Sequence, residues 1–295
     1  DLWKSNQIDY AVVPDEMVAT HLDQYPDLTF KKGGQTVSNI LFQINHPPFD
    51  DVHMRRAFSA AFDRSGFIDE VLVGGGIPLK HFGPPGVFGA PPRDEVGVGY
   101  DPEFASIELE NAGYPDCQGL PTIDLIITHS DLRLQAEELV QFWEEGLGCP
   151  PGTIRFHPEF GIGDIPTLNH DDYDLLSLNY FGEFPDEDTW VGQAAYCTEN
   201  SPKSQLVYRE CNNIDELITL AREETSRPDR VELYRQIEEA LFGREGTFPI
   251  MPIYSPYRYF AVRDWTEMVY KEFLMREDFS NWTVDMEAKE SALGD

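Results

Sequence analysis

A strand-like pattern gives way to a helix-like pattern within one short stretch of the chain. Residues 37–45, VSNILFQIN, alternate apolar and polar positions and are rich in large and β-branched residues, which predicts a strand. Pro47 and Pro48 end it, because proline has no amide hydrogen to donate and disfavours helical geometry in the preceding residue. Apolar residues then recur at helical spacing, at Val52, Met54, Ala57, Phe58, Ala61 and Phe62. We therefore expect a strand, a turn and a helix capped by Asp50 or Asp51.

The rest of the chain alternates between the same two periodicities. Apolar or alternating stretches predict further strands at residues 6–13, 28–32, 122–128, 153–157, 173–180, 249–254 and 258–262. Helical spacing and its capping signals predict helices at residues 14–24, 65–73, 101–112, 131–147, 213–225 and 229–242. The strand, helix, strand order between residues 122 and 180 favours parallel pairing through right-handed crossovers. The pattern as a whole predicts an α/β fold.

A long loop is expected at residues 78–92. The tetrapeptide GPPG at 83–86 and the proline pair at 91–92 exclude regular structure there. Loops of this length in compact domains are often functional. A loop that only packs on the surface is an equally good interpretation.

Composition and charge narrow the class of protein. At 295 residues the chain is long enough for two lobes, and 22 basic residues against 53 acidic ones give a formal net charge of −31. Such a surface repels phosphates, which argues against nucleic acid as a partner. The charge is compatible with an exported protein, an acidic cytosolic enzyme or a salt-adapted protein. The sequence has no initial Met and no basic, then apolar leader, so any export signal is expected to have been removed or to lie outside it.

The four cysteines favour disulfides over a metal site. Cys117, Cys149, Cys197 and Cys211 form no C-x-x-C pair, and their even number suits two disulfides in an oxidising compartment. Three pairings are possible. Cys117 with Cys149 and Cys197 with Cys211 is favoured, because each bridge would close a local loop near a predicted helix or strand end. Four buried free thiols remain the alternative.

Signatures of common enzyme classes are missing. The sequence contains no G-x-S-x-G, no H-E-x-x-H and no phosphate loop. Its histidines lack ligand spacing and are interpreted as surface or capping residues: His21, His46, His53, His81, His129, His157 and His170. No cofactor and no metal are therefore expected.

An acidic run directly after the strand predicted at 173–180 is the candidate site. It contains Glu183, Asp186, Glu187 and Asp188, and the rings of Tyr180, Phe181, Phe184 and Trp190 lie close in sequence. Ligands in open α/β sheets gather beyond the carboxyl ends of strands. The carboxylates could hydrolyse a glycoside, hold calcium or bind a cationic group, which would gain from nearby ring faces. A solvated acidic turn that caps the next helix is an equally good interpretation.

Four blocks of sequence resemble one family. They are PPFDDVHMRRAFSAAFDR at 47–64, YDPEFASIELENAGYP at 100–115, YRQIEEALF at 234–242 and FPIMPIY at 248–254. In this order they resemble the family 5 extracellular solute-binding proteins of ABC importers, the oligopeptide, dipeptide and nickel-binding type. The resemblance implies a periplasmic binding protein-like α/β fold (cluster C, type II), with a mixed sheet flanked by helices. It also implies that the chain is a carboxyl-terminal fragment of a two-lobed protein.

The resemblance further implies how the chain divides and what it does. Residues 1–40 would be a first-lobe segment and hinge, 41–250 the carboxyl-terminal ligand-binding lobe, and 251–295 the return hinge and a first-lobe segment. The whole protein would be a monomer outside the cytoplasm, in the periplasm or at the cell surface, with a lipid anchor as one option. It would capture a peptide, or a sugar, opine or chelated metal, and deliver it to an ABC transporter permease.

Peptide binders of this family carry a W-x-x-D-x-x-D-P-like segment whose first Asp binds the ligand's α-amino group. In this chain Tyr180 stands at the Trp, Glu183 at the first Asp, Asp186 at the second Asp and Glu187 at the Pro. The resemblance therefore implies Glu183 as the charged contact. Tyr180, Phe181 and Trp190 would be walls of the site, Asp186 a further ligand-binding residue, and the loop at 78–90 would lie near the mouth.

Two other function classes stay open from the sequence. One is a secreted carbohydrate-acting hydrolase that uses Glu183 and Asp186 as its paired carboxylates. The other is a solute-binding lobe that serves as a sensor. The four sequence blocks favour the interpretation that the protein captures a solute and does not catalyse a reaction.

Overall fold

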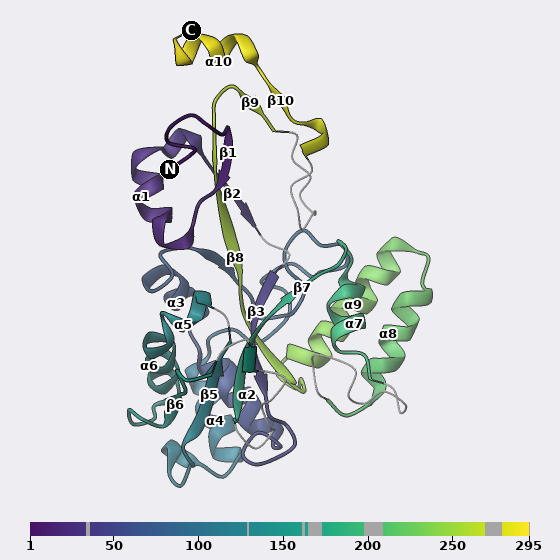
Figure 1. Cartoon of the computed structure of the whole chain (residues 1–295). Coiled ribbons are helices and arrows are strands. Elements are labelled where there is room, and N and C mark those ends of the chain that lie inside the picture. Colours follow the sequence, from purple (N-terminus) through teal and green to yellow (C-terminus); the bar gives the residue numbers. More distant parts are fainter. Residues whose placement is uncertain are drawn as a thin grey trace. The chain divides into compact units, whose positions relative to one another are not determined.

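The computed structural model describes residues 1–33, 36–128, 130–160, 163–164, 173–197, 209–268 and 279–294. The chain divides into two compact units: Asp1–Gln35 with Pro256–Asp295, and Thr36–Ser255 (Figure 1). The strand β8 (Ile250–Val262) contributes residues to both units.

A mixed sheet forms the centre of the larger unit. Strand β3 (Thr36–Phe42) lies between β7 (Leu175–Phe181) and the first part of β8, and it is antiparallel to both. Strand β5 (Ile123–Ile127) is parallel to β7 and to β6 (Ile154–Phe156). The short β4 (Gly76–Pro78) pairs with β8. The parallel pairing expected between residues 122 and 180 is therefore confirmed, and so is the mixed α/β sheet.

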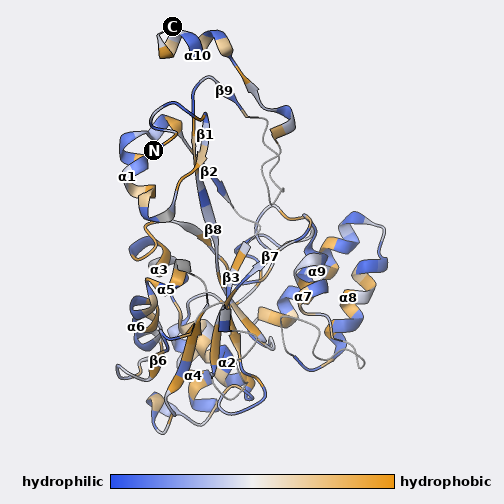
Figure 2. Cartoon of the chain, viewed as in Figure 1, coloured by the Kyte–Doolittle hydropathy of each residue, from blue (hydrophilic) through white to orange (hydrophobic). Residues whose placement is uncertain are grey.

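Helices flank this sheet, and all of them except the short α7 (Val191–Ala194) lie at positions where a helix was expected. They are α2 (Val52–Ala61), α3 (Arg64–Glu70), α4 (Pro102–Asn111), α5 (Ser130–Arg133), α6 (Ala136–Leu147), α7 (Val191–Ala194), α8 (Asn213–Glu223) and α9 (Arg227–Phe242). Asp51 caps α2 by accepting a hydrogen bond from the backbone N–H of His53 at 2.9 Å, as the sequence suggested. Figure 2 shows apolar residues concentrated on the central strands, while the helices carry both apolar and hydrophilic residues.

Aromatic residues form part of the core of the larger unit. Phe49, Phe58, Phe62 and Trp143 are fully buried, and the Trp143 indole N–H donates to the carbonyl of Phe58 at 2.8 Å. Arg64 is buried among them and donates to the carbonyls of Pro252 and Ser59. The helix that follows the double proline thus supplies much of this core.

The smaller unit has its own sheet and core. Strands β1 (Tyr10–Val12) and β2 (Thr29–Gly33) both pair antiparallel with the second part of β8. Helix α1 (Val18–Gln24) lies between them in sequence, and the buried core contains Trp3, Val13, Tyr259 and Ala261. The strands β9 (Thr266–Glu267) and β10 (Thr283–Val284) form a separate pair, followed by α10 (Met286–Leu293). No helix among the described residues is long and apolar enough to cross a membrane.

Two details of the expected secondary structure were wrong. Strand β8 runs without interruption through Pro252 and Pro256, where two separate strands were expected. Its register against β3 shifts between Ser38 and Asn39, at the level of Pro252, and such an irregularity tolerates a residue that cannot donate. The helix expected at 131–147 is divided into α5 and α6, and the side chain of Leu134, which lies between them, is 82% exposed.

The cysteines form two disulfides, Cys117–Cys149 and Cys197–Cys211, in the pairing favoured from the sequence. The first connects the end of the α4 region with the end of α6. The second joins the segment after α7 to the residue just before the cap of α8. Each bridge closes a local loop, as expected.

Candidate functional site

The turn after β7 brings the predicted site residues together. It spans residues 182–190 and includes the short 3-10 helix η5 (Glu187–Thr189) before α7. The Tyr180 hydroxyl donates to the carbonyl of Thr189 at 2.6 Å, and the backbone N–H of Glu183 donates to the Thr189 hydroxyl at 3.0 Å. The turn is therefore closed on itself by Thr189. The pKa of Tyr180 is raised to about 12, chiefly because the phenol is removed from water.

Glu183 and its neighbouring rings face solvent. The Glu183 side chain is exposed, and Phe181 and Phe184 are 45% and 38% exposed. Among the described residues, no side chain or backbone group bonds the Glu183 carboxylate. It is therefore a negative charge flanked in sequence by two exposed aromatic rings, a combination that suits a cationic group.

Trp190 and Tyr180 pack against the turn and stabilise it. Trp190 is fully buried, and Tyr180 is half-buried with its ring 5.3 Å from that of Phe82. A Cβ atom on Gly182 would lie 2.0 Å from the Trp190 indole, so the backbone at Gly182 rests directly on that ring. Trp190 thus sets the shape of the turn and does not line its exposed surface.

Asp186 is held by an arginine of α9. The Arg230 guanidinium bonds both carboxylate oxygens of Asp186, at 2.6 and 2.9 Å, and the Tyr234 hydroxyl donates to the same group at 3.2 Å. Asp186 also accepts the backbone N–H of Asp188 and so caps η5. A bidentate pair with arginine fixes the carboxylate in place and occupies both of its oxygens. Asp186 therefore has no free oxygen pair for acid and base chemistry beside Glu183, which removes the support for a two-carboxylate hydrolase.

The loop predicted at 78–92 lies against this turn. Phe88 pairs with Asp186 as an isolated β-bridge, and its backbone N–H donates to the carbonyl of Pro185 at 3.2 Å. The Phe88 carbonyl accepts the backbone N–H of Glu187 at 2.8 Å. The guanidinium of Arg227 lies 4.2 Å from the centre of the Phe88 ring. The loop is thus ordered by the same segment that carries Glu183.

The sequence did not predict which side chains of this region are buried or paired, although Glu187 was part of the acidic run. Glu187, Glu238 and His81 are fully buried, and Arg230 holds Asp186. Glu238 lies four residues after the buried Tyr234 on α9, so its place on the inward face could have been found from helical spacing. The expectation that the histidines lie at the surface was wrong for His81 and His21, since both side chains are buried. His129 and His170 lie outside the described residues.

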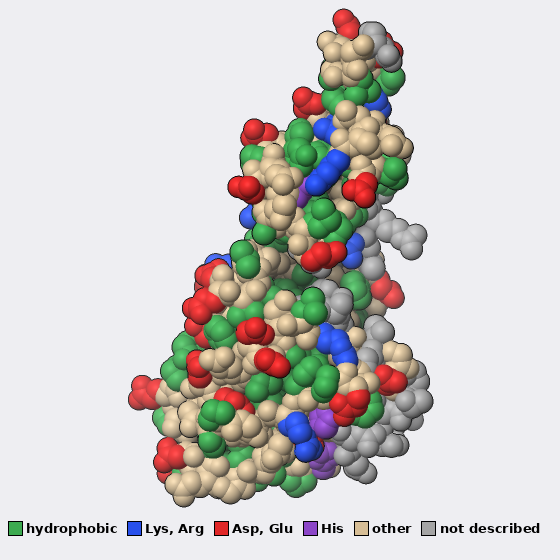
Figure 3. Space-filling view, turned by 60° about the vertical axis from the view of Figure 1, so that its left-hand side comes forward, with side chains coloured by type: hydrophobic (Ala, Val, Ile, Leu, Met, Phe, Trp, Pro, Cys, Tyr) green, Lys and Arg blue, Asp and Glu red, His purple; other side chains and the backbone are tan. Residues whose placement is uncertain are grey.

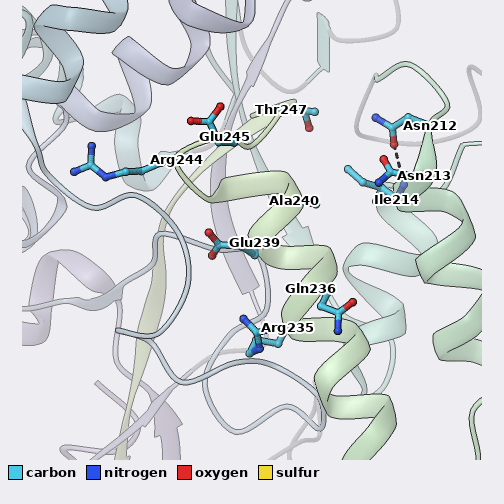
Figure 4. A pocket seen from close by; sticks show the side chains of 10 residues that line it. All are labelled: Asn212, Asn213, Ile214, Arg235, Gln236, Glu239, Ala240, Arg244, Glu245 and Thr247. Carbon is cyan, nitrogen blue, oxygen red and sulfur yellow. Dashed lines mark hydrogen bonds between the residues drawn. The ribbon is translucent and has the colours of Figure 1, made fainter.

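A separate open pocket lies at the other end of α9. It has a volume of about 490 Å³ and is lined by residues of the α8 cap and the carboxyl-terminal half of α9, including Asn212, Gln236 and Arg235 (Figure 4). Its two arginines are paired, Arg235 with Glu232 and Arg244 with Asp101. None of the predicted site residues lines this pocket.

No metal centre emerges from the described residues. The one group of ligand-type side chains close enough to share an ion consists of Cys197, Cys211 and Asp215, among the residues that could be searched. Its two cysteines are joined to each other as a disulfide and have no thiolate to offer.

Comparison with protein families gives one match. Residues 1–202 match the model described as "Bacterial extracellular solute-binding proteins, family 5 Middle". This covers more than half of the chain. It agrees with the resemblance that the four sequence blocks suggested.

Curated relatives have the names of binding proteins. "Di/tripeptide-binding protein 2" of Pseudomonas aeruginosa is 25% identical over 287 residues, which are 96% of this chain and 52% of that protein. "Periplasmic oligopeptide-binding protein OppA" of Escherichia coli is 24% identical over 86% of this chain and 43% of its own length. "Heme-binding protein A" of Haemophilus influenzae is 37% identical over 74% of this chain and 39% of its own length. The chain thus spans about half or less of these relatives.

Solved structures share the fold. HbpA2 from Haemophilus parasuis superposes with a TM-score of 0.77 at 18% identity, over 96% of this chain and 55% of that structure. A periplasmic oligopeptide-binding protein from Borrelia burgdorferi superposes with a TM-score of 0.76 at 22% identity, over the same shares. The periplasmic binding protein-like fold expected from the sequence is confirmed.

Proposed function

We propose a solute-capturing role, because this chain belongs to the bacterial extracellular solute-binding proteins, family 5. The protein that contains it would bind a small solute outside the cytoplasm and release it to the permease of an ABC importer. Capture without turnover fits a site whose second carboxylate is already paired with Arg230. The names of the relatives, all binding proteins, support the same role.

The larger unit is proposed to be the carboxyl-terminal ligand-binding lobe. From the sequence, this lobe is expected at 41–250, with hinge and first-lobe segments at 1–40 and 251–295. The compact units, divided near residues 35 and 255, lie close to these limits. We propose that the smaller unit belongs to the first lobe of the whole protein. The ligand would lie between the lobes, and the protein would act as a monomer.

Glu183 is proposed to bind a cationic group of the ligand. This rests on one observation: the Glu183 carboxylate is exposed and unpaired among the described residues, on a turn whose backbone is fixed by Thr189. Phe181 would add an apolar contact, while Tyr180, Asp186 and Trp190 would hold the turn in place. Peptides are the ligand class we favour, because their α-amino group matches a carboxylate beside aromatic rings.

Calorimetric titration of the full-length protein with a panel of dipeptides and tripeptides tests this role. Glu183→Ala should weaken binding of the best peptide by about 30-fold or more, because deleting one partner of a desolvated charge pair costs about 2 to 5 kcal/mol. Glu239→Ala, which removes an exposed acid on α9, should bind like wild type. Equal affinities of wild type and Glu183→Ala would show that Glu183 is not the anchor.

A further inference from the structure

Two fully buried carboxyl groups lie beneath the candidate site. Glu187 belongs to η5 and Glu238 to α9, and neither side chain has any solvent exposure. Glu238 accepts the backbone N–H groups of Phe82 at 3.1 Å and of Gly83 at 2.7 Å. With no proton between the two carboxyl groups, both oxygens of Glu187 lack a donor among the described residues. The Glu238 carboxyl group is therefore compensated by hydrogen bonds, while an ionised Glu187 would have no compensation.

Both carboxyl groups lie against Gly83, since its N–H donates to Glu238 at 2.7 Å and a Cβ atom there would lie 2.1 Å from Glu187 Oε2, so a proton on one of them can be shared with the other. Burial raises the pKa of Glu187 well above its ordinary value, and repulsion by Glu238 and the hydrogen bond to Glu238 add to this effect. Two carboxyl groups that share a desolvated site retain one proton, because both cannot ionise together. The pair thus holds one proton at pH values where an ordinary glutamate has none.

Among the residues that the structure describes, no neighbouring cation is placed to neutralise the second charge. His81 is buried with its Nδ1 3.9 Å from Glu238, and burial lowers the pKa of this histidine. The charges that act on His81 from its own loop are Lys80 and Asp94. Asp186 and Asp188, on the turn, repel an ionised Glu187.

The other charged and titratable groups around the pair, within the described part of the chain, are already paired. On α9, Arg230 is bonded to Asp186, and the Tyr234 hydroxyl bonds the same pair. On α8, Arg222 is bonded to Asp188 at 2.6 Å. Deprotonation of the Glu187–Glu238 pair would therefore leave two like charges in the interior.

The loop at 79–90, which is the part of the predicted loop that follows β4, is attached to both members of the pair. Its amides at Phe82 and Gly83 are bound by Glu238, and its carbonyl at Phe88 accepts the N–H of Glu187. A Cβ atom on Gly83 would lie 2.1 Å from Glu187 Oε2, so the loop backbone rests directly on this carboxyl group. Any separation of the two carboxyls must move the loop.

We propose that Glu187 and Glu238 are positioning residues that share one proton and, through it, hold the loop at 79–90 against the turn that carries Glu183. The role in ligand binding rests on the proposed function, whereas the attachment of the loop does not. Because the folded state favours the protonated pair, the attachment is complete at low pH and is lost as the pH rises through the raised pKa of Glu187.

Hydrogen exchange of the full-length protein, measured between pH 6 and 9.5 and corrected for the intrinsic rate, tests the proposal without a ligand. In wild type the protection of the amides of Phe82 and Gly83 should fall by up to about tenfold per pH unit above the pKa of the pair. Glu187→Gln, which keeps the shape and a donor for Glu238, should keep its protection across this range. Glu239→Gln, an exposed neighbour on α9, should behave like wild type.

The same pH profile in wild type and Glu187→Gln would overturn the proposal. If Glu187→Gln does not fold, carboxyl ¹³C NMR of wild type decides: a glutamate that titrates above about pH 7 supports the shared proton, and titration of all glutamates below about pH 6 overturns it.

Trialanine binding separates this proposal from the proposed function. Its affinity should fall toward pH 9.5 in wild type and stay constant in Glu187→Gln, and a fall of equal size in both would overturn the link to the ligand. Glu183→Ala should lose binding but keep the protection of the loop. Failure of every peptide to bind at any pH would count against the proposed function alone, because the exchange result does not depend on a ligand.

Discussion

Single side chains decide what the turn after β7 can do. Glu183 and Asp186 are three residues apart, but one is exposed without a partner and the other is fixed by Arg230. The difference comes from α9, which lies about 45 positions further along the chain and directs Arg230 at one carboxylate only. Two acidic residues that the sequence pattern does not distinguish therefore differ in their surroundings. Glu183 is exposed to solvent, whereas Asp186 is held in the structure by Arg230.

The histidines should titrate in an order set by their surroundings. Burial opposes a charge on His157, but its hydrogen bonds to Asp124 at 2.9 Å and Glu159 at 2.8 Å outweigh burial and raise its pKa. Burial lowers the pKa of His21 and of His81. NMR titration of the imidazole rings should give His157 the highest midpoint of the three. A midpoint for His157 below either of the others would contradict this.

The His157 contacts should also make stability depend on pH. A raised pKa in the folded state stabilises below the unfolded value of about 6.5, and this contribution disappears as the pH rises through the folded value. His157→Gln should therefore lose about 0.5 to 1 kcal/mol more at pH 5.5 than at pH 8.5, the size of a partly exposed ion pair. Urea unfolding at the two pH values measures it, and equal losses would refute the assignment.

Local sequence signals located the acidic run, but they did not show which of its side chains are buried. Glu183 was found because an acidic run with aromatic neighbours follows a strand, and both signals are local. Glu187 was in the same run, but nothing local distinguishes a buried glutamate from an exposed one. Its environment depends on Glu238 and Gly83, both far away in sequence. Local sequence patterns do not predict long-range packing of this kind.

At the scale of elements, periodicity located the helices and strands well and their interruptions less well. The strand before Pro47 and the helix after Pro48 form as expected, because the prolines and the cap of Asp51 act locally. The unbroken β8 was missed, since Pro252 is tolerated only through a register shift in its partner β3. A property of two paired strands cannot be read from one of them.

Close packing of Gly182 on Trp190 makes this position sensitive. Gly182→Ala places a methyl group 2.0 Å from the indole, so the turn or the ring must move. Overpacking of this kind costs about 1 to 3 kcal/mol, which thermal unfolding should show as a lower Tm. Gly99→Ala is the matched control, because its Cβ would meet only the Lys80 side chain at 3.8 Å. Equal stability of the two variants would mean that the turn has room to adjust.

At the scale of the whole molecule, charge is the dominant feature. The formal net charge is −31, and acidic side chains are spread across the face shown in Figure 3. Self-repulsion of this kind destabilises a compact state, and salt screens it because the Debye length falls from about 10 Å at 0.1 M to about 3 Å at 1 M. The Tm should therefore rise by several degrees between these two concentrations.

NaCl and KCl should raise the Tm equally, because screening does not depend on the identity of the cation. A constant or falling Tm would show that repulsion does not limit stability. A rise with only one of the two salts would indicate a specific ion site instead.

The family was predictable from the sequence, whereas the ligand was not. Four short blocks in the right order carried the resemblance, and the family match and the shared fold agree with it. We propose that the surface around Glu183 contributes to the choice of solute, and the relatives extend to about twice the length of this chain. Peptide-binding and heme-binding relatives match the same segments, so the scaffold alone does not select a ligand.

The proposed contact between Glu183 and the cationic group of a solute can be tested by comparing a peptide that carries this group with one that lacks it. Calorimetric titration of the full-length protein should compare the best-binding tripeptide with the same tripeptide acetylated at its amino terminus. Acetylation removes the charge and should weaken binding by about 30-fold or more, as the loss of a desolvated charge contact requires. Equal affinity for the free and the acetylated peptide would contradict the claim.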